Sequence, residues 1–192
     1  MCGRYSLDAD IFAILNHYKL DNQELEYGGR DEIFPTNKSP IIDMDRQLTF
    51  MDWGFSTSFS KRPLINARGE TVSEKVTFKK PFQFARCLIP ATSFYEWETI
   101  DGKKVRNRIK PSGLEIFSMA GIYKAIHLDG QKVFQYSIIT TQANEQMRYI
   151  HDRMPVILKP DEEFRFLEKA AATQEIEKLL KPYSGELEIS ID

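Results

Sequence analysis

The sequence predicts an α+β domain with a curled antiparallel or mixed β-sheet as a barrel-like core, flanked by helices. Three observations lead to this fold class. Strand-like runs fill the middle of the chain, turn signals separate several of them, and helical patterns gather near its two ends. The 192 residues include 42% hydrophobic and 28% charged side chains, a composition typical of a soluble globular domain. We therefore expect residues 1–192 to form a single domain.

The first expected element is a helix over residues 8–20. Asp8 or Asp10 stands in front of it and can accept hydrogen bonds from the free N–H groups of its first turn. Four apolar residues recur at the spacing of one helix face: Ile11, Ile14, Leu15 and Tyr18.

The central part of the chain is expected to be mostly β. Asp101-Gly102 and Asp129-Gly130 are hairpin turn signals, because both positions of a tight hairpin turn need positive φ angles. Strand-like runs occur near residues 40–44, 47–53, 87–98, 114–124 and 132–141.

Helical patterns return near the end of the chain, at about 142–150, 161–170 and 173–181. Leu187, Ile189 and Ile191 then alternate with polar residues, which predicts a closing strand.

Four basic residues also alternate after the Asp101-Gly102 turn: Lys104, Arg106, Arg108 and Lys110. On a strand they would line one face. The favoured interpretation is an edge strand that positive charge protects from aggregation. The alternative is the shoulder of a groove for DNA.

The charge is unevenly distributed along the chain. Formal net charge is −2, but residues 161–192 hold nine acidic and four basic side chains. Residues 1–160 therefore carry +3, so the acidic end can mask a moderately basic working surface. No apolar run approaches the ~18 residues of a membrane span, and no signal peptide is evident. We expect a cytoplasmic protein without a membrane partner, associated with the nucleoid if the source is bacterial.

The number and spacing of cysteines and histidines argue against a disulfide framework and a metal site. Cys2 and Cys87 are too few for a disulfide framework, and Cys87 in its apolar run is expected to be a buried structural thiol. The three histidines stand far apart, at His17, His127 and His151, without the spacing of metal ligands. We expect neither a metal nor a cofactor.

Cys2 is the residue with the most specific chemistry. If Met1 is removed, its free amine and its thiol lie on adjacent carbons, a pair that no internal residue offers. The amine can condense with an aldehyde to an imine, and the thiol can then close a five-membered thiazolidine. Both groups titrate close enough to neutral pH to supply usable nucleophile.

Three polar clusters interrupt the apolar pattern: Asn66-Ala67-Arg68-Gly69-Glu70, Phe94-Tyr95-Glu96-Trp97 and His151-Asp152-Arg153-Met154-Pro155. Each has a structural interpretation, as a surface ion pair, an outward-pointing strand residue or a helix cap. With Cys2 they form a coherent set. Glu96 among aromatic residues should have a raised pKa suited to proton transfer, His151 can exchange a proton near neutral pH, and Asn66 can orient an amine.

The remaining members of the set would bind a nucleic-acid strand. Arginine forks suit phosphates, and tryptophan faces suit stacked bases. The candidates are Arg4, Arg68, Arg153, Trp53 and Trp97.

The same clusters carry a family resemblance. Met-Cys-Gly-Arg at the start, Pro35-Thr36, Trp53-Gly54-Phe55 and the three polar clusters resemble, in order and spacing, the SOS-response-associated peptidase (SRAP) family, the abasic-site processing proteins. The resemblance covers residues 1 to about 160, and residues 161–192 match no motif.

The resemblance implies one α+β domain with a barrel-like core and a positively charged cleft. It implies recognition of abasic sites in single-stranded DNA and a covalent cross-link through Cys2, with a weak lyase activity beside it. Asn66, Glu96 and His151 would complete the catalytic set. Arg4, Pro35, Trp53, Arg68, Trp97 and Arg153 would contact DNA, although Ile33-Phe34-Pro35-Thr36 departs from the family's commoner version of that loop.

Two other functions remain open at this point. The protein could be a thiol peptidase in which Cys2 attacks the peptide bond before it, with no role in DNA. It could also be a non-covalent module for single-stranded DNA, in which Cys2 is dispensable. We expect a monomer in each case.

Overall fold

The structure is a computed structural model that describes residues 2–21 and 25–192. Its helices are α1 (Ile11–Tyr18), α2 (Val76–Phe84), α3 (Pro160–Phe166) and α4 (Thr173–Glu177), with a 3-10 turn η1 at Gly69–Thr71. The strands of the first half are β1 (Tyr5–Leu7), β2 (Arg30–Ile33), β3 (Lys38–Ile42), β4 (Leu48–Trp53), β5 (Phe55–Thr57), β6 (Ser60–Leu64) and β7 (Asn66–Arg68). Those of the second half are β8 (Arg86–Ala91), β9 (Ser93–Ile100), β10 (Lys103–Pro111), β11 (Phe117–Leu128), β12 (Gln131–Gln142), β13 (Arg153–Pro155), β14 (Ile157–Leu158) and β15 (Leu187–Ile191).

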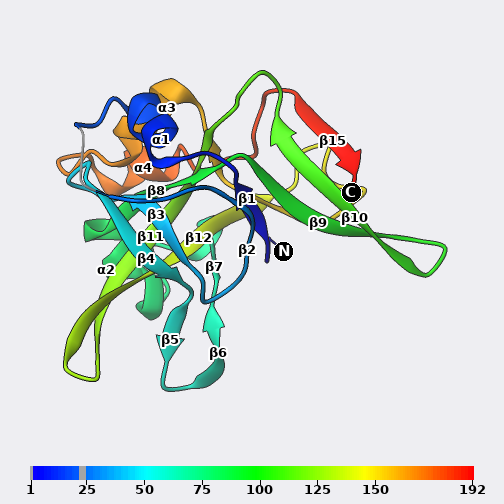
Figure 1. Cartoon of the computed structure of the whole chain (residues 1–192). Coiled ribbons are helices and arrows are strands. Elements are labelled where there is room, and N and C mark those ends of the chain that lie inside the picture. Colours follow the sequence, from blue (N-terminus) through cyan, green and yellow to red (C-terminus); the bar gives the residue numbers. More distant parts are fainter. Residues whose placement is uncertain (1, 22–24) are drawn as a thin grey trace.

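A small barrel forms the centre of the molecule (Figure 1). Strands β12, β4, β3, β8 and β11 pair in that order, and the β11–β12 hairpin closes the ring. The β4–β12 pair is parallel and the others are antiparallel, so the barrel is mixed. The predicted fold class is confirmed.

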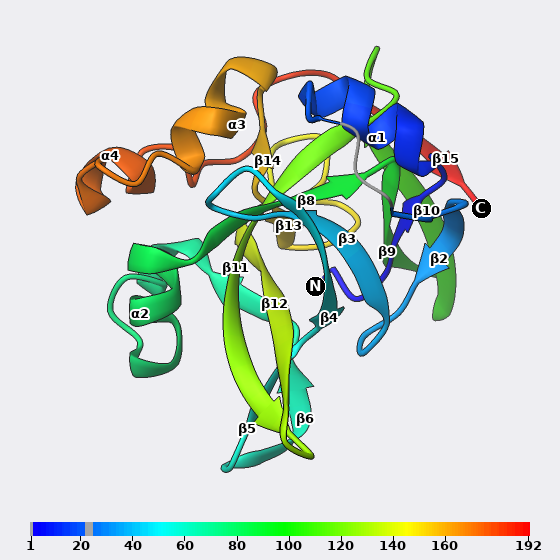
Figure 2. The same cartoon turned by 60° about the vertical axis from the view of Figure 1, so that its left-hand side comes forward.

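A second sheet lies beside the barrel, in the order β15-β10-β9-β1-β2. Helices α1, α3 and α4 gather at one end of the barrel, and α2 lies beside β11 (Figures 1 and 2). Apolar side chains of both sheets belong to one buried cluster, which extends to Phe166, Ile176 and Leu187 near the end of the chain. The two sheets thus share one core, and a single domain over residues 1–192 stays a prediction.

Local sequence chemistry explains the elements that were predicted best. Asp10 is the N-cap of α1, because its carboxylate accepts a 2.8 Å hydrogen bond from the Ala13 N–H. Both residues of each Asp-Gly turn have positive φ angles, between 48° and 79°. These turns join β9 to β10 and β11 to β12 as predicted. Cys87 is fully buried, as expected.

Two predicted elements need correction. The run at 87–98 is two strands, β8 and β9, which belong to different sheets. The helix expected at 142–150 is not formed, because Gln142 ends β12 and residues 145–150 are a series of turns. The Ala143 N–H donates to Asp152 O at 2.9 Å and draws the two ends of this segment together, while Asn144 caps Met147. The segment is therefore a closed loop that ends beside His151.

The interpretation of residues 104–110 as an edge strand is wrong. β10 lies between β9 and β15, and β15 occupies the edge. The basic side chains are instead used within the sheet. Lys110 pairs with Glu188 of β15 at 3.0 Å, and Arg108 donates to the Ser93 hydroxyl of β9 at 3.1 Å.

None of the helices among the described residues is long and apolar enough to cross a membrane.

Candidate active site

Four separate segments bring the predicted catalytic residues together where the two sheets meet. Cys2 precedes β1, Asn66 begins β7, Glu96 lies in β9, and His151 directly precedes β13. The Asn66 side-chain N–H donates to the Cys2 carbonyl at 2.9 Å, so an amide from the barrel side holds the start of the chain. The Asn66 Oδ1 atom is buried without a hydrogen-bond partner among the described residues. It can therefore accept a hydrogen bond from a nearby amine.

Cys2 is fully buried, and its thiol lies 3.8 Å from the Arg4 carbonyl. Burial raises the pKa of the thiol far above its ordinary value, and the negative charge of Glu96 raises it further. The thiol is therefore protonated at neutral pH. Of the two nucleophiles that a processed Cys2 would carry, the amine is the one suited to attack first.

Glu96 is 3% exposed. Burial raises the pKa of its carboxyl group. The positive charge of His151 opposes this effect, and the negative charge of Asp152 reinforces it. Glu96 is thus close enough to both Cys2 and His151 for their charges to interact. A buried carboxylic acid with a raised pKa can give and take protons close to neutral pH.

His151 is half-buried and has two partners at the same nitrogen. Its Nδ1 atom accepts the Arg153 backbone N–H at 2.9 Å and lies 2.8 Å from the Asp152 carboxylate. The first contact suits the neutral ring and the second suits the protonated ring. The two contacts therefore fix the orientation of the ring, as a proton-transfer group requires.

Arg4 is held in an aromatic and acidic cage. Its guanidinium carbon lies 4.0 Å from the centre of the Phe34 ring and 5.4 Å from that of Trp97, and Nη1 donates to Glu32 at 3.1 Å. The structure therefore brings two predicted DNA contacts, Arg4 and Trp97, together next to Cys2. Pro35 is half-buried in the turn between β2 and β3, directly after Phe34.

Arg68 and Arg153 have different environments. Arg68 is exposed, whereas Arg153 is 9% exposed. Arg153 donates a bidentate pair of hydrogen bonds to Glu70, at 2.6 and 2.8 Å, and a further one to the Thr140 carbonyl at 2.8 Å. Arg68 can reach a phosphate directly. The Arg153 side chain instead links Thr140 of β12 to Glu70, in the segment after β7.

Trp53 lies inside the protein. Its indole N–H donates to the Ile65 carbonyl at 3.0 Å, and its ring packs between those of Tyr5 and Tyr136. The side chain is fully buried, so no face of the ring is open to a base. In this structure Trp53 supports the strand before Asn66 and is not part of a binding surface.

Sequence reasoning missed three residues near the site: Glu32, Asn107 and Asp192. Glu32 pairs with Arg4 and also with Arg106, and Arg106 in turn pairs with Asp192 at 2.9 Å. Asn107 is buried directly opposite Glu96 in the β9–β10 pair. The register of the Asp101-Gly102 hairpin places Asn107 opposite Glu96, so counting outward from the turn would have found this pair.

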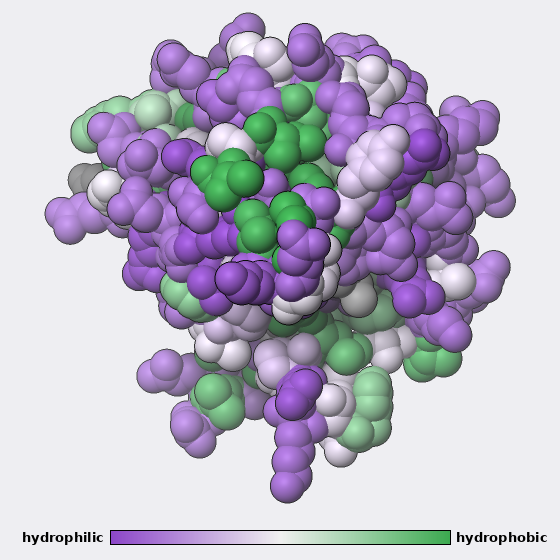
Figure 3. Space-filling view, turned by 90° about the vertical axis from the view of Figure 1, so that its right-hand side faces the viewer, coloured by the Kyte–Doolittle hydropathy of each residue, from purple (hydrophilic) through white to green (hydrophobic). Residues whose placement is uncertain are grey.

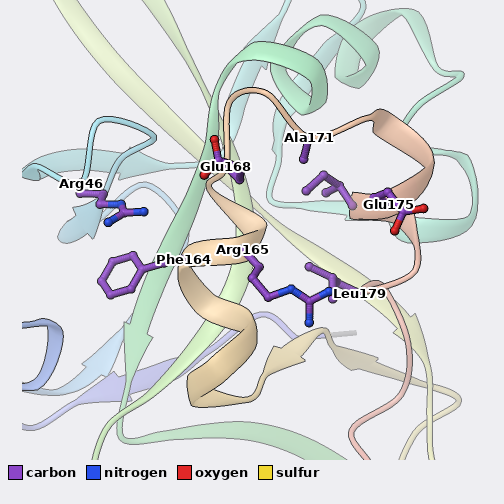
Figure 4. Close-up of a pocket in the computed structure, with 8 residues that line it drawn as sticks. Arg46, Phe164, Arg165, Glu168, Ala171, Glu175 and Leu179 are labelled. Atoms are coloured by element: carbon purple, nitrogen blue, oxygen red, sulfur yellow. The ribbon is translucent and has the colours of Figure 1, made fainter.

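A separate pocket of about 320 Å³ lies between α3, α4 and Arg46 (Figure 4). Arg46 lies over the Phe164 ring, 4.7 Å from its centre. None of the predicted site residues lines this pocket. Within the described part of the chain, no group of three or more His, Cys, Asp or Glu residues could hold a metal ion.

Comparison with known proteins decides the family. The family model described as SOS response associated peptidase (SRAP) matches residues 1–191. The chain belongs to this SRAP family. The family match extends through the acidic end of the chain, beyond residue 160, where the recognisable motifs stop.

Similar proteins include two named as abasic site processing proteins. YoqW of Bacillus subtilis is 37% identical over 97% of this chain and 89% of its own length. YedK of Escherichia coli is 30% identical over 84% of this chain and 77% of its own length. A crystal structure of a protein from Bacteroides thetaiotaomicron has a TM-score of 0.89 and 27% identity, covering 99% of this chain and 91% of that one.

Proposed function

We propose that this protein processes abasic sites in single-stranded DNA by forming a covalent thiazolidine cross-link through Cys2, once Met1 has been removed. One observation carries the proposal: Asn66 holds the Cys2 backbone beside the buried Glu96 carboxyl group. The names of the SRAP relatives support DNA containing abasic sites as the substrate. Met1 itself lies outside the described residues.

The chemistry begins with the amine. The Cys2 nitrogen attacks the aldehyde carbon of the ring-opened abasic sugar, and the adduct gains a proton on oxygen and loses water to give an imine. Glu96 in its acid form supplies that proton. The thiol then adds across the C=N bond, its sulfur bonding to carbon and its proton passing to nitrogen. Aldehyde and aminothiol thus give thiazolidine and one water.

The raised thiol pKa fits this order of events. A protonated thiol does not compete with the amine for the aldehyde, yet it delivers the proton that the imine nitrogen needs for ring closure. A competing loss of the 3′ phosphate is also open to the imine. Removal of a proton from the adjacent carbon by His151 or Glu96 would expel the phosphate, giving a weak lyase activity.

The DNA strand would approach past the half-buried Arg4, the exposed Arg68 and one aromatic face. We assign phosphate binding to Arg4 and Arg68 and base or sugar contact to Trp97 and Pro35. For Arg153, a direct phosphate contact remains a prediction, because Glu70 already occupies its fork. The protein would act as a monomer on DNA, which in a bacterium places it at the nucleoid.

The family description favours a second activity, peptide-bond cleavage. Here Cys2 would attack the carbonyl of Met1, assisted by Glu96 and His151, and cleavage would expose the Cys2 amine. We propose this as self-processing that prepares the cross-linking site. We do not extend this to a peptidase acting on other proteins, because Arg68 and Trp97 would then have no role.

The test is a cross-linking assay on Cys2→Ala and Cys2→Ser. We expect Cys2→Ala to give no heat-stable cross-link, because the thiazolidine needs sulfur. Cys2→Ser should also give no stable product, since an oxazolidine hydrolyses more easily, although its amine can keep some lyase activity. Intact mass after incubation with abasic single-stranded DNA reports Met1 loss and adduct formation together. A heat-stable cross-link from Cys2→Ala would refute the thiazolidine, and unchanged function would favour a non-covalent binding module.

A further inference from the structure

The sheet that carries Glu96 continues outward from the candidate site. Glu96 in β9 lies opposite Asn107 in β10, and Asn107 lies opposite Ile191 in β15. Residues paired in this way point to the same face of a sheet. With strands about 4.8 Å apart, the Ile191 backbone lies about 10 Å from that of Glu96. The catalytic carboxyl group and Ile191 therefore share one continuous surface.

The outer part of this face is apolar and exposed. Ile191 is 74% exposed and Ile189 is 37% exposed, while Val105, on the same face of β10, is half-buried. The inner part of the same face, at Ile109 and Leu187, is buried in the core. Figure 3 shows apolar side chains gathered on this side of the molecule. An exposed apolar patch next to a reactive site indicates that something packs there.

The loop that carries His151 is attached to β15, at the inner end of the same face. The Gln146 side chain donates to Gly185 O at 3.0 Å and accepts the Leu187 N–H at 2.9 Å, which fixes the loop to the start of β15. The patch, defined as Val105, Ile189 and Ile191, therefore shares a sheet face with Glu96, and β15 connects it to the loop of His151.

The distribution of charge on this sheet indicates what kind of chemical group can pack on the patch. Arg106, Arg108 and Lys110 alternate with the patch residues and lie on the opposite face, with Trp97. On the patch side the described residues of the three strands carry Glu96 and Glu98, with Lys103 only at the hairpin end. This face therefore offers phosphates no cation beside the patch, but it can receive an uncharged apolar surface. Three side chains are also far too few for a stable dimer interface, which buries about 800 Å² per partner.

We propose that the patch receives the nucleobase next to the abasic sugar. This inference rests on the proposed function. A base beside an abasic site has lost a stacking partner, so one of its flat faces is exposed to water. Aliphatic side chains can cover that face without reading its hydrogen-bonding edge. The patch would thus favour abasic sites that have an intact neighbouring base, whatever its identity.

The experiment measures binding of Ile191→Ser to single-stranded oligonucleotides with a central tetrahydrofuran abasic analogue, which has no aldehyde and so reports equilibrium binding. Fluorescence anisotropy gives Kd for an oligonucleotide with both neighbouring bases, and for two others in which the 5′ or the 3′ neighbour is a second tetrahydrofuran. We expect Ile191→Ser to raise Kd about fivefold when both bases are present. We expect less than a twofold effect when the base that occupies the patch is missing.

Leu128→Ser is the matched control, because Leu128 is 57% exposed at the far tip of the β11–β12 hairpin. It should not change Kd on any oligonucleotide. An equal effect of Ile191→Ser on all three, or no effect, would overturn the inference. Cross-linking of the wild-type protein to a true abasic site is measured in parallel. Its absence would refute the proposed function, whereas normal cross-linking without the base-dependent effect would refute only the role of the patch.

Discussion

At the scale of single residues, the acid strength of Glu96 has a cause that the sequence suggests only in part. Aromatic neighbours in Phe94-Tyr95-Glu96-Trp97 predicted a raised pKa, and the structure has that direction. However, Tyr95 and Trp97 alternate with Glu96 and point to the opposite face, toward the arginines Arg4 and Arg106. Glu96 is buried in the folded chain, where its charge interacts with those of Cys2 and His151. Such burial comes from segments distant in sequence, so the local pattern cannot reveal it.

The pH dependence of cross-linking tests the role of Glu96. If its acid form drives loss of water from the adduct, the rate should fall as pH rises through the Glu96 pKa. Because burial raises that pKa above its ordinary value of 4.5, the fall should occur at higher pH than for an exposed carboxyl group. Glu96→Gln should lose this dependence and cross-link about 100-fold more slowly at neutral pH. Rates are compared on protein whose N-terminus has been checked by mass. A wild-type rate and profile in Glu96→Gln would withdraw the catalytic assignment.

At the scale of elements, some helices and strands can be predicted from adjacent residues, whereas others form only because they pair with distant strands. The capped helix α1 and the two Asp-Gly hairpins were predicted because their chemistry lies within a few adjacent residues. Strands β1, β7 and β13, of three residues each, carry no readable period and exist because they pair with longer strands. They are also the elements that adjoin Cys2, Asn66 and His151. The motifs therefore pointed to the candidate catalytic residues, whereas only the pairing of these short strands with their neighbours brings the candidates together.

Gly54 belongs to the Trp53-Gly54-Phe55 motif, but only the structure explains why this position needs a glycine. It joins β4 to β5 with φ of +114°, and its N–H donates to the Tyr136 carbonyl at 2.7 Å. A Cβ atom there would lie 2.7 Å from Pro63 Cβ and 3.2 Å from Ile65 Cγ2. We expect Gly54→Ala to lower the free energy of unfolding by about 2 kcal/mol or more, from backbone strain and the clash together. Urea denaturation gives the value.

Gly102→Ala is the matched control for this prediction. Gly102 also has a positive φ, +75°, but a Cβ atom there would meet nothing within 4 Å. It should therefore show only the backbone strain, about 1 kcal/mol. Equal destabilisation by the two substitutions would mean that the close approach of Pro63 does not constrain the β4–β5 junction.

At the scale of the whole molecule, the two sheets meet at the start of the chain. Some arginines near this junction are free to bind DNA, and others stabilise the fold. The sequence analysis assigned Arg68 and Arg153 the same role, because arginine forks suit phosphates. Only the folded chain distinguishes them. Arg68 lies on the surface, and Arg153 is held by Glu70 and the Thr140 carbonyl. The Arg153 fork lowers the pKa of Glu70, so this pair is ionised at neutral pH.

Substitution of Arg68 should therefore change mainly the salt dependence of DNA binding, and substitution of Arg153 mainly the stability of the fold. Arg68→Ala should lower the log–log salt slope for single-stranded DNA by about 0.7, the value for one lost phosphate contact, with little change in stability. Arg153→Ala should cost about 2 kcal/mol of stability, because the Glu70 carboxylate and the Thr140 carbonyl lose their donor. Its salt slope should change less, since Glu70 already neutralises the Arg153 charge. Anisotropy across a salt series and urea denaturation measure the two quantities. A slope change for Arg153→Ala as large as that for Arg68→Ala would place Arg153 on the DNA, and an unchanged slope for Arg68→Ala would move the strand away from β7.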